Sequence, residues 1–152
     1  MGLELLLREV ERRRDACAAA LSSANRQWEA AVQRAETAQQ LARERALSRD
    51  AWLERSETGN CRVFLAGEWQ QRTAEAQAAE QQWQLAAREA DSRRRQLDEA
   101  EQHWRQVRQE WQALDLLRQR REQQRVDRER TDAARQHHDL IAANAAMSSR
   151  QL

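Results

Sequence analysis

Apolar residues recur along two stretches of the chain at alternating spacings of three and four residues. From Leu3 to Trp52, 12 of the 15 positions at this spacing are apolar, and from Leu65 to Leu114, 13 of the 15 are. This alternation is typical of the seam of a coiled coil, in which one stripe of each helix faces a partner helix. We refer to these positions as the seam.

Turn-forming residues between the two seams gather at one place, residues 57–60, around Gly59. Glycine can adopt the conformation that ends a helix, and a short connection makes two helices antiparallel neighbours. We therefore predict an all-α fold: a long antiparallel two-helix coiled-coil hairpin with a longer C-terminal helix. The first helix is expected over about 3–56 and the second over about 61–146, within a single domain of residues 1–152.

The composition supports long helices. The chain is 40% hydrophobic and 34% charged, with no proline and three glycines, and it is rich in Ala, Glu, Gln, Arg and Leu. These residues favour helix over the turns that a compact domain of this length needs. The periodic apolar residues and the formal net charge of +1 argue against disorder.

A turn centred near Gly59 places residue i opposite roughly residue 118 − i. In that register Trp28 faces about Ala90, and Trp52 faces about Ala66, so that large side chains meet small ones. Core packing is therefore expected for the six tryptophans, which all lie on the seams: Trp28, Trp52, Trp69, Trp83, Trp104 and Trp111.

The turn end is expected to carry a protein-binding surface. Three consecutive bulky residues follow the turn, and consecutive residues of a helix cannot all face one partner. In the predicted register Trp69 stands opposite about Arg49, where the seam is weakest, and tryptophan is a frequent hot-spot residue. The expected binding residues are Val63, Phe64 and Trp69.

A polar extension follows the second seam. In the predicted register the first helix is used up near residue 115, so residues 118–139 overhang without a partner in the chain. From Arg118 to Arg135 there are seven arginines and four acidic residues, a net charge of +3. We expect these charges to spread around the helix and to bind a protein partner, through Arg118, Arg121, Arg125, Arg128 and Asp132. No role is assigned to the apolar segment 140–147.

No enzymatic or cofactor-binding motif emerges. His137 and His138 are adjacent, so on a helix they point about 100° apart and do not share a metal ion. Cys17 and Cys61 would lie far apart along the length of the hairpin, so two free thiols and a reducing, cytoplasmic location are expected. Acidic residues are interleaved with every arginine cluster, so no nucleic acid is expected as a partner. No apolar run approaches the length of a membrane span.

Three stretches resemble the FliJ/YscO family of type III export (flagellar or virulence secretion) ATPase stalk proteins. They read CRVFL at residues 61–65, WRQVRQEWQA at residues 104–113 and RVDRERTD at residues 125–132. The chain departs from the family at residues 133–134, where two alanines stand in place of the Glu-Phe that the family often has.

The resemblance implies a non-enzymatic central stalk of a protein export apparatus, cytoplasmic and peripheral to the inner membrane, without direct membrane insertion. Its expected partners are the hexameric export ATPase, the cytoplasmic domain of the export-gate membrane protein, and export chaperones. Two other function classes remain open, a generic coiled-coil adaptor or chaperone scaffold and a nucleic-acid-associated helical protein. The flagellar or virulence branch, and a monomeric hairpin or a helix-swapped dimer, also remain open.

Overall fold

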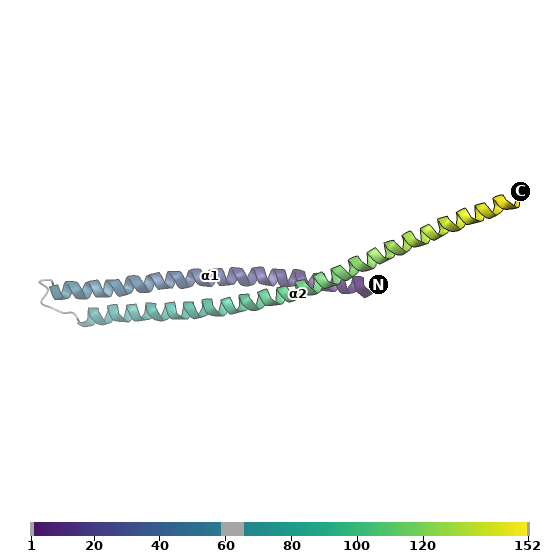
Figure 1. Cartoon of the computed structure of the whole chain (residues 1–152). Helices are drawn as coiled ribbons and strands as arrows, with labels where there is room; N and C mark the ends of the chain where they lie inside the picture. Colours follow the sequence, from purple (N-terminus) through teal and green to yellow (C-terminus); the bar gives the residue numbers. More distant parts are fainter. Residues whose placement is uncertain (1, 59–65, 152) are drawn as a thin grey trace. The chain divides into compact units, whose positions relative to one another are not determined.

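The computed structural model describes residues 2–58 and 66–151, and these residues form two helices (Figure 1). Helix α1 spans Gly2–Thr58 and helix α2 spans Ala66–Arg150, and the described residues contain no strand. The two helices pack against each other, which confirms an all-α helical hairpin whose second helix is the longer, with 85 residues against 57.

The helix ends differ slightly from the prediction. Glu57 and Thr58 belong to α1, whereas the sequence placed them in the turn. The helix continues because no helix-breaking residue precedes Gly59, and Ser56 Oγ donates to the Trp52 carbonyl oxygen at 2.8 Å within this last part of the helix. The remaining turn residues, with the expected start of the second helix at 61, lie in the segment 59–65, outside the described residues.

Helix α2 also ends later than predicted, at Arg150 and not near residue 146. The hydroxyl groups of Ser148 and Ser149 donate to the carbonyl oxygens of Asn144 and Ala146, at 3.0 and 2.9 Å. These serine side chains therefore hydrogen-bond back to the last turns of the helix and do not interrupt it.

The chain divides into two compact units, which are described separately. In the unit Asp15–Arg105, α1 and α2 run antiparallel around a thin core. Its buried residues are Cys17, Ala31, Ala42, Ala76, Ala79 and Leu97. In the unit formed by Met1–Arg14 and Gln106–Leu152, the buried residues are Leu7, Val10 and Val107. All nine are seam positions, so the predicted seam is confirmed where the structure describes it.

The predicted register is wrong by about three residues. Trp52 contacts Trp69, with ring centroids 5.9 Å apart, where the prediction placed it opposite Ala66. Arg93 donates to Gln27 Oε1 at 2.7 Å. The numbers of these paired residues sum to 121 and 120, where the prediction had 118, because α1 continues to Thr58 and the midpoint of the pairing therefore lies beyond Gly59. The pairing of large with small side chains therefore fails at Trp52.

All six tryptophans are half-buried, neither fully enclosed nor free in solvent. They lie on the predicted seam, but an indole ring is too large for the narrow space between two helices. Polar groups of the facing helix contact some of these rings: Trp111 Nε1 donates to Glu11 Oε1 at 3.4 Å, and the Arg94 guanidinium lies over Trp28. A half-buried position suits a side chain that is apolar with one polar group.

Candidate protein-binding surfaces

The described part of the turn end is an aromatic and arginine cluster. Trp52 and Trp69 stack with an angle of 26° between the rings, and the Arg72 guanidinium carbon lies 6.0 Å from the Trp52 centroid. Arg72 also donates to Ser48 Oγ at 3.1 Å and pairs with Glu68 at 3.5 Å. The cluster occupies the position that the sequence assigned to a weak, open seam.

Of the three predicted turn-end residues, the structure describes Trp69 alone, since Val63 and Phe64 lie outside the described residues. Trp69 does not face Arg49, whose Nε pairs with Asp50 at 3.2 Å. It is half-buried against Trp52, so part of its surface already serves the hairpin. The rest of the indole ring is accessible, and its role in partner binding stays a prediction.

Arginine–tryptophan contacts recur along the paired helices, and sequence reasoning missed them. Arg14 lies 4.6 Å from the Trp111 centroid in one unit, and Arg94 lies 4.9 Å from the Trp28 centroid in the other. A guanidinium group over an indole face is favourable electrostatically. Arginines at or beside the seam thus contribute to pairing. The feature of the sequence that could have predicted such contacts is arginine at seam positions, where a coiled coil usually has aliphatic residues.

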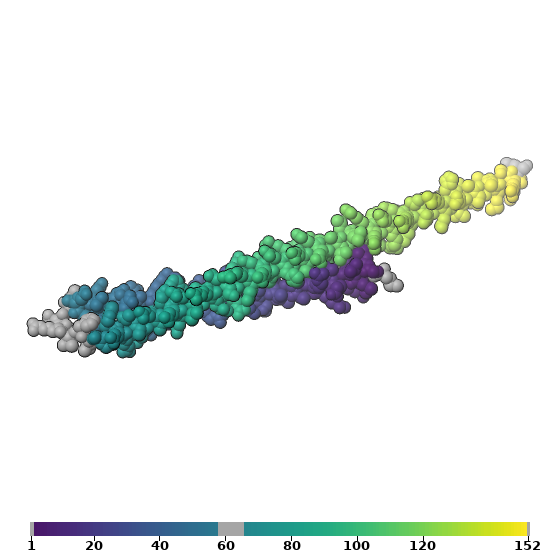
Figure 2. Space-filling model, turned by 90° about the horizontal axis from the view of Figure 1, so that it is seen from below, coloured from purple at the N-terminus to yellow at the C-terminus, as the bar shows by residue number. Residues whose placement is uncertain are grey.

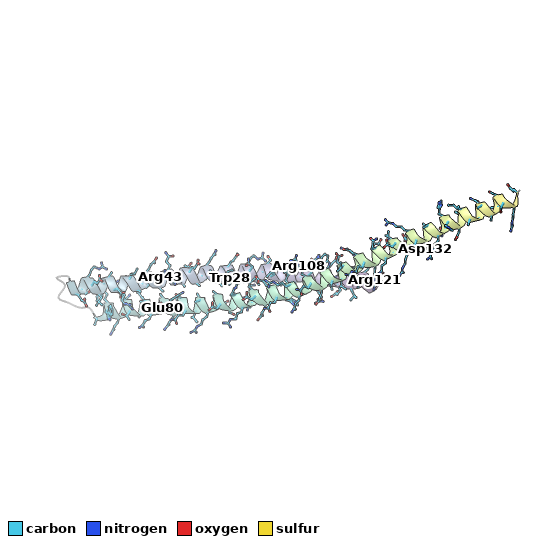
Figure 3. The ribbon with its side chains drawn as sticks, in the orientation of Figure 1. Trp28, Arg43, Glu80, Arg108, Arg121 and Asp132 are labelled. Carbon is cyan, nitrogen blue, oxygen red and sulfur yellow. The ribbon has the colours of Figure 1, made fainter. Side chains whose placement is uncertain are left out.

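The five residues predicted at the open end all lie on α2 and are exposed (Figure 3 labels Arg121 and Asp132). From Leu116 to Gln151, every described residue except Val126 is exposed. Figure 2 shows this end of α2 as a single exposed helix over its yellow part. The structure therefore leaves these residues accessible to a partner.

The expectation that the charges spread around the helix is wrong. Five of the seven arginines between residues 118 and 135 continue the alternating spacing that runs through Trp111 and Leu114. At 100° per residue these five fall within an arc of about 100° on the uninterrupted helix α2. We call them the arginine stripe: Arg118, Arg121, Arg125, Arg128 and Arg135. Asp132, also predicted, occupies the one position of this spacing that is not arginine, between Arg128 and Arg135.

Part of the stripe is neutralised by its own helix. Arg118 pairs with Asp115 at 2.6 Å, and Arg125 pairs with Glu122 at 2.6 Å and Glu129 at 2.8 Å. The hydrogen bond from Arg125 lowers the pKa of Glu122 below its usual value, and the hydrogen bond and charge of Glu122 raise the pKa of Arg125. These three carboxylates form an acidic flank along one side of the stripe.

The other arginines of the stripe are available. Within the described ranges Arg121, Arg128 and Arg135 have no ion pair or hydrogen bond to another side chain. Their charges are therefore exposed and uncompensated by direct contact.

Exposed apolar side chains stand near both ends of the unit that contains the stripe. Leu5, Leu6, Leu116 and Leu117 are exposed by 40% or more, and so are three side chains further along α2: Leu140, Ile141 and Met147.

Among residues 2–58 and 66–151, no group of His, Cys, Asp and Glu side chains has the arrangement of a metal site. No described helix has an 18-residue window apolar enough to cross a membrane.

No protein-family model, no curated protein and no solved structure matches this chain.

Proposed function

We propose that this protein is a non-enzymatic central-stalk component of a type III protein export apparatus, located in the cytoplasm beside the inner membrane. The observation that carries the proposal is the second helix, which extends as an exposed, arginine-striped helix beyond the apolar seam. A helix that is polar on its surface suits a solvated or loosely lined channel better than a hydrophobic groove. The resemblance to the stalk family supplies the identity of that channel, the hexameric export ATPase.

The turn end is proposed to contact the cytoplasmic domain of the export gate, through Val63, Phe64 and Trp69. Tryptophan contributes strongly to protein interfaces because it offers a large rigid surface at low entropic cost. The stacked pair of Trp52 and Trp69 supports the proposal, since it holds one indole ring in place before a partner arrives.

Truncation tests the ATPase proposal. A chain ending after Leu117 lacks all five arginines of the stripe, but keeps every seam residue that is buried in the structure. We expect it to retain the melting temperature of the paired helices and to lose stimulation of the cognate ATPase. The measurement is steady-state ATP hydrolysis at equal stalk concentrations, with circular dichroism of both chains as the folding control.

An adaptor or chaperone scaffold is the competing function, and the exposed apolar residues of the C-terminal segment favour it. Leu140, Ile141 and Met147 are each more than half exposed, and a purely polar channel does not require them. Full stimulation of the ATPase by the truncated chain would favour this alternative. A chain with these three residues changed to Ser that still stimulates hydrolysis, but no longer retains its partners in pull-downs, would assign them a separate adaptor role.

A further inference from the structure

The seam positions of helix α2 change from apolar residues to arginines along the helix, while their alternating spacing of three and four residues continues. From Ala76 to Leu114 the seam positions are apolar except for Arg93, and from Arg118 to Arg135 five of six are arginine. The phase is the one that faces α1 in the paired part of the helix. The arginine stripe is therefore placed where a second helix packs, but it offers a partner cations in place of an apolar surface.

The chain itself shows what packs well against arginines in this fold. Two of the three seam arginines of α1 meet such groups on α2: Arg14 lies 4.6 Å from the Trp111 centroid, and Arg45 Nη1 meets a Glu75 carboxylate oxygen at 3.3 Å. Beside the seam, Arg13 pairs with Glu110 at 3.0 Å. Among the described contacts across this interface, arginines thus meet carboxylates and tryptophan rings of the facing helix, and in two cases a Gln27 amide oxygen or a Ser48 hydroxyl group.

Two other occupants fit less well. A second copy of the stripe, laid against the first, would bring arginines against arginines, which is destabilising. A nucleic acid would bring its phosphates beside the acidic flank of Asp115, Glu122 and Glu129, which repels them. An acidic helix that meets only the stripe, and presents neutral or basic residues to the flank, avoids both penalties.

We propose that the arginine stripe is a coiled-coil seam for a partner helix that carries glutamate or aspartate together with tryptophan at its own seam positions. Arg121, Arg128 and Arg135 would form the new ion pairs and ring contacts, because the described structure gives them no partner of their own. The proposal deepens the proposed function, on which it rests for the presence of a partner at this end of the protein. It names the chemistry of that partner's contact surface.

The test is binding of a designed peptide to the full chain. The probe is a fluorescein-labelled helical peptide with Glu and Trp at its seam positions and Arg at the flanking positions, on an Ala/Gln background. A scrambled peptide of the same composition is the reference. We expect the designed peptide to bind at low ionic strength, at least about tenfold more tightly than the scrambled one, and to bind less tightly as salt is added, because the contacts are charge pairs.

Matched variants of the protein separate the stripe from overall charge. Arg121→Glu with Arg128→Glu changes two stripe positions, whereas Arg120→Glu with Arg130→Glu makes the same change in net charge outside the stripe. The first pair should weaken binding by about tenfold or more, because each lost ion pair is replaced by repulsion, and the second by about threefold or less. Circular dichroism should show both variants folded, since all four arginines are exposed.

Three outcomes would overturn the inference: equal effects of the two variant pairs, equal binding of the scrambled peptide, or tighter binding of a DNA duplex that the stripe pair abolishes. The peptide assay contains no ATPase. Its failure therefore rejects the stripe as a seam and leaves the stalk function standing. Conversely, normal peptide binding by a chain that does not stimulate the ATPase would reject the stalk function alone.

Discussion

Two segments of helix α2 continue the same alternating spacing of seam positions, but they carry different residue types at those positions. Along the segment that faces α1, the seam positions carry alanine, leucine, valine and tryptophan, apart from Arg72 and Arg93, and all of those in residues 66–114 are at least half-buried. Along residues 118–135, the same positions carry the arginine stripe and are exposed. Both segments are helical. Helix formation and helix pairing are thus separate properties of this chain, and the buried apolar residues of the paired segment all lie on the seam.

Local interactions explain how the exposed segment is helical without the paired core. Arg125 bridges Glu122 and Glu129, three and four residues away, and Gln123 donates to Asp127 at 2.9 Å. Each such pair stabilises a helix by only about 0.2–0.5 kcal/mol, and a helix without tertiary contacts is marginal in water. The paired segment gains in addition from burial of its seam, so it should resist perturbation far better.

The largest contrast should come from placing the same charge at equivalent seam positions of the two segments. Val107 is 0% exposed and Arg121 is exposed, and both occupy the same position of the repeat, 14 residues apart. Val107→Asp buries an unpaired carboxylate and should lower the free energy of unfolding by about 3 kcal/mol or more. Arg121→Asp should change it by about 0.5 kcal/mol or less.

Urea denaturation followed by circular dichroism gives both values. A loss of stability from Arg121→Asp that matched the loss from Val107→Asp would mean that the arginine stripe is buried in solution, against a contact that the described structure lacks.

A smaller effect should appear at the tryptophan stack within the paired segment. In a double-mutant cycle of Trp52→Ala and Trp69→Ala, the coupling free energy should be about 0.5–1.5 kcal/mol, the usual value of an aromatic pair. The matched cycle combines Trp52→Ala with Trp28→Ala, which lie far apart on the same helix and should be additive. If the first cycle were additive as well, the stack would contribute only the burial of each ring separately.

The ion pair between Arg13 and Glu110 should contribute less again. Their side chains are 44% and 49% exposed, so solvent screens the 3.0 Å contact. A double-mutant cycle with alanine should give a coupling of about 0.2–1 kcal/mol that falls as salt is raised to 1 M. A coupling independent of salt would show that the pair is shielded from solvent and that the register near the N-terminus differs from the one described.

The smallest effect concerns the pH dependence of the exposed segment. The pKa of Glu122 in the helix is below its ordinary value of 4.5, mainly because Arg125 donates to it. The carboxylate therefore stabilises the helix at pH values above its ordinary pKa, and this contribution is lost as the pH falls through the lowered pKa. Glu122→Gln should reduce local helicity at neutral pH, and the difference from the unmodified chain should disappear in acid.

Nuclear magnetic resonance of Cα shifts over residues 118–130 measures this local helicity. Asp139→Asn is the control, since Asp139 has no ion pair in the described structure and should show a much smaller change at neutral pH. A difference for Glu122→Gln that grew in acid would contradict the assigned direction of the pKa shift.

The sequence predicted the seam well because a 3–4 alternation of apolar residues has one plausible structural meaning. Every described seam position except Arg45 is at least half-buried. The register was not predictable in the same way, since it depends on how many residues separate the helices, and Glu57 and Thr58 give no strong local signal for ending a helix.

The arginine stripe was present in the sequence and was overlooked because the seam was followed only as far as it stayed apolar. Following the spacing beyond Leu114, whatever the residue type, would have found Arg118 and the four arginines after it. The contacts of Arg14 with Trp111 and of Arg72 with Trp52 could not be predicted from the sequence in this way. They depend on the register and on side-chain rotation, and neither is encoded in a binary pattern of apolar and polar positions.

The alanine layers of the unit Asp15–Arg105 have a consequence for which substitutions the protein tolerates. Ala31 is 0% exposed, and Ala42, Ala76 and Ala79 are each exposed by 6% or less. A larger side chain at these positions would wedge the helices apart, although it would be more hydrophobic. Selection on this core should therefore act on volume more than on polarity. A saturation mutagenesis screen should accept Gly or Ser at Ala31 more readily than Leu or Phe.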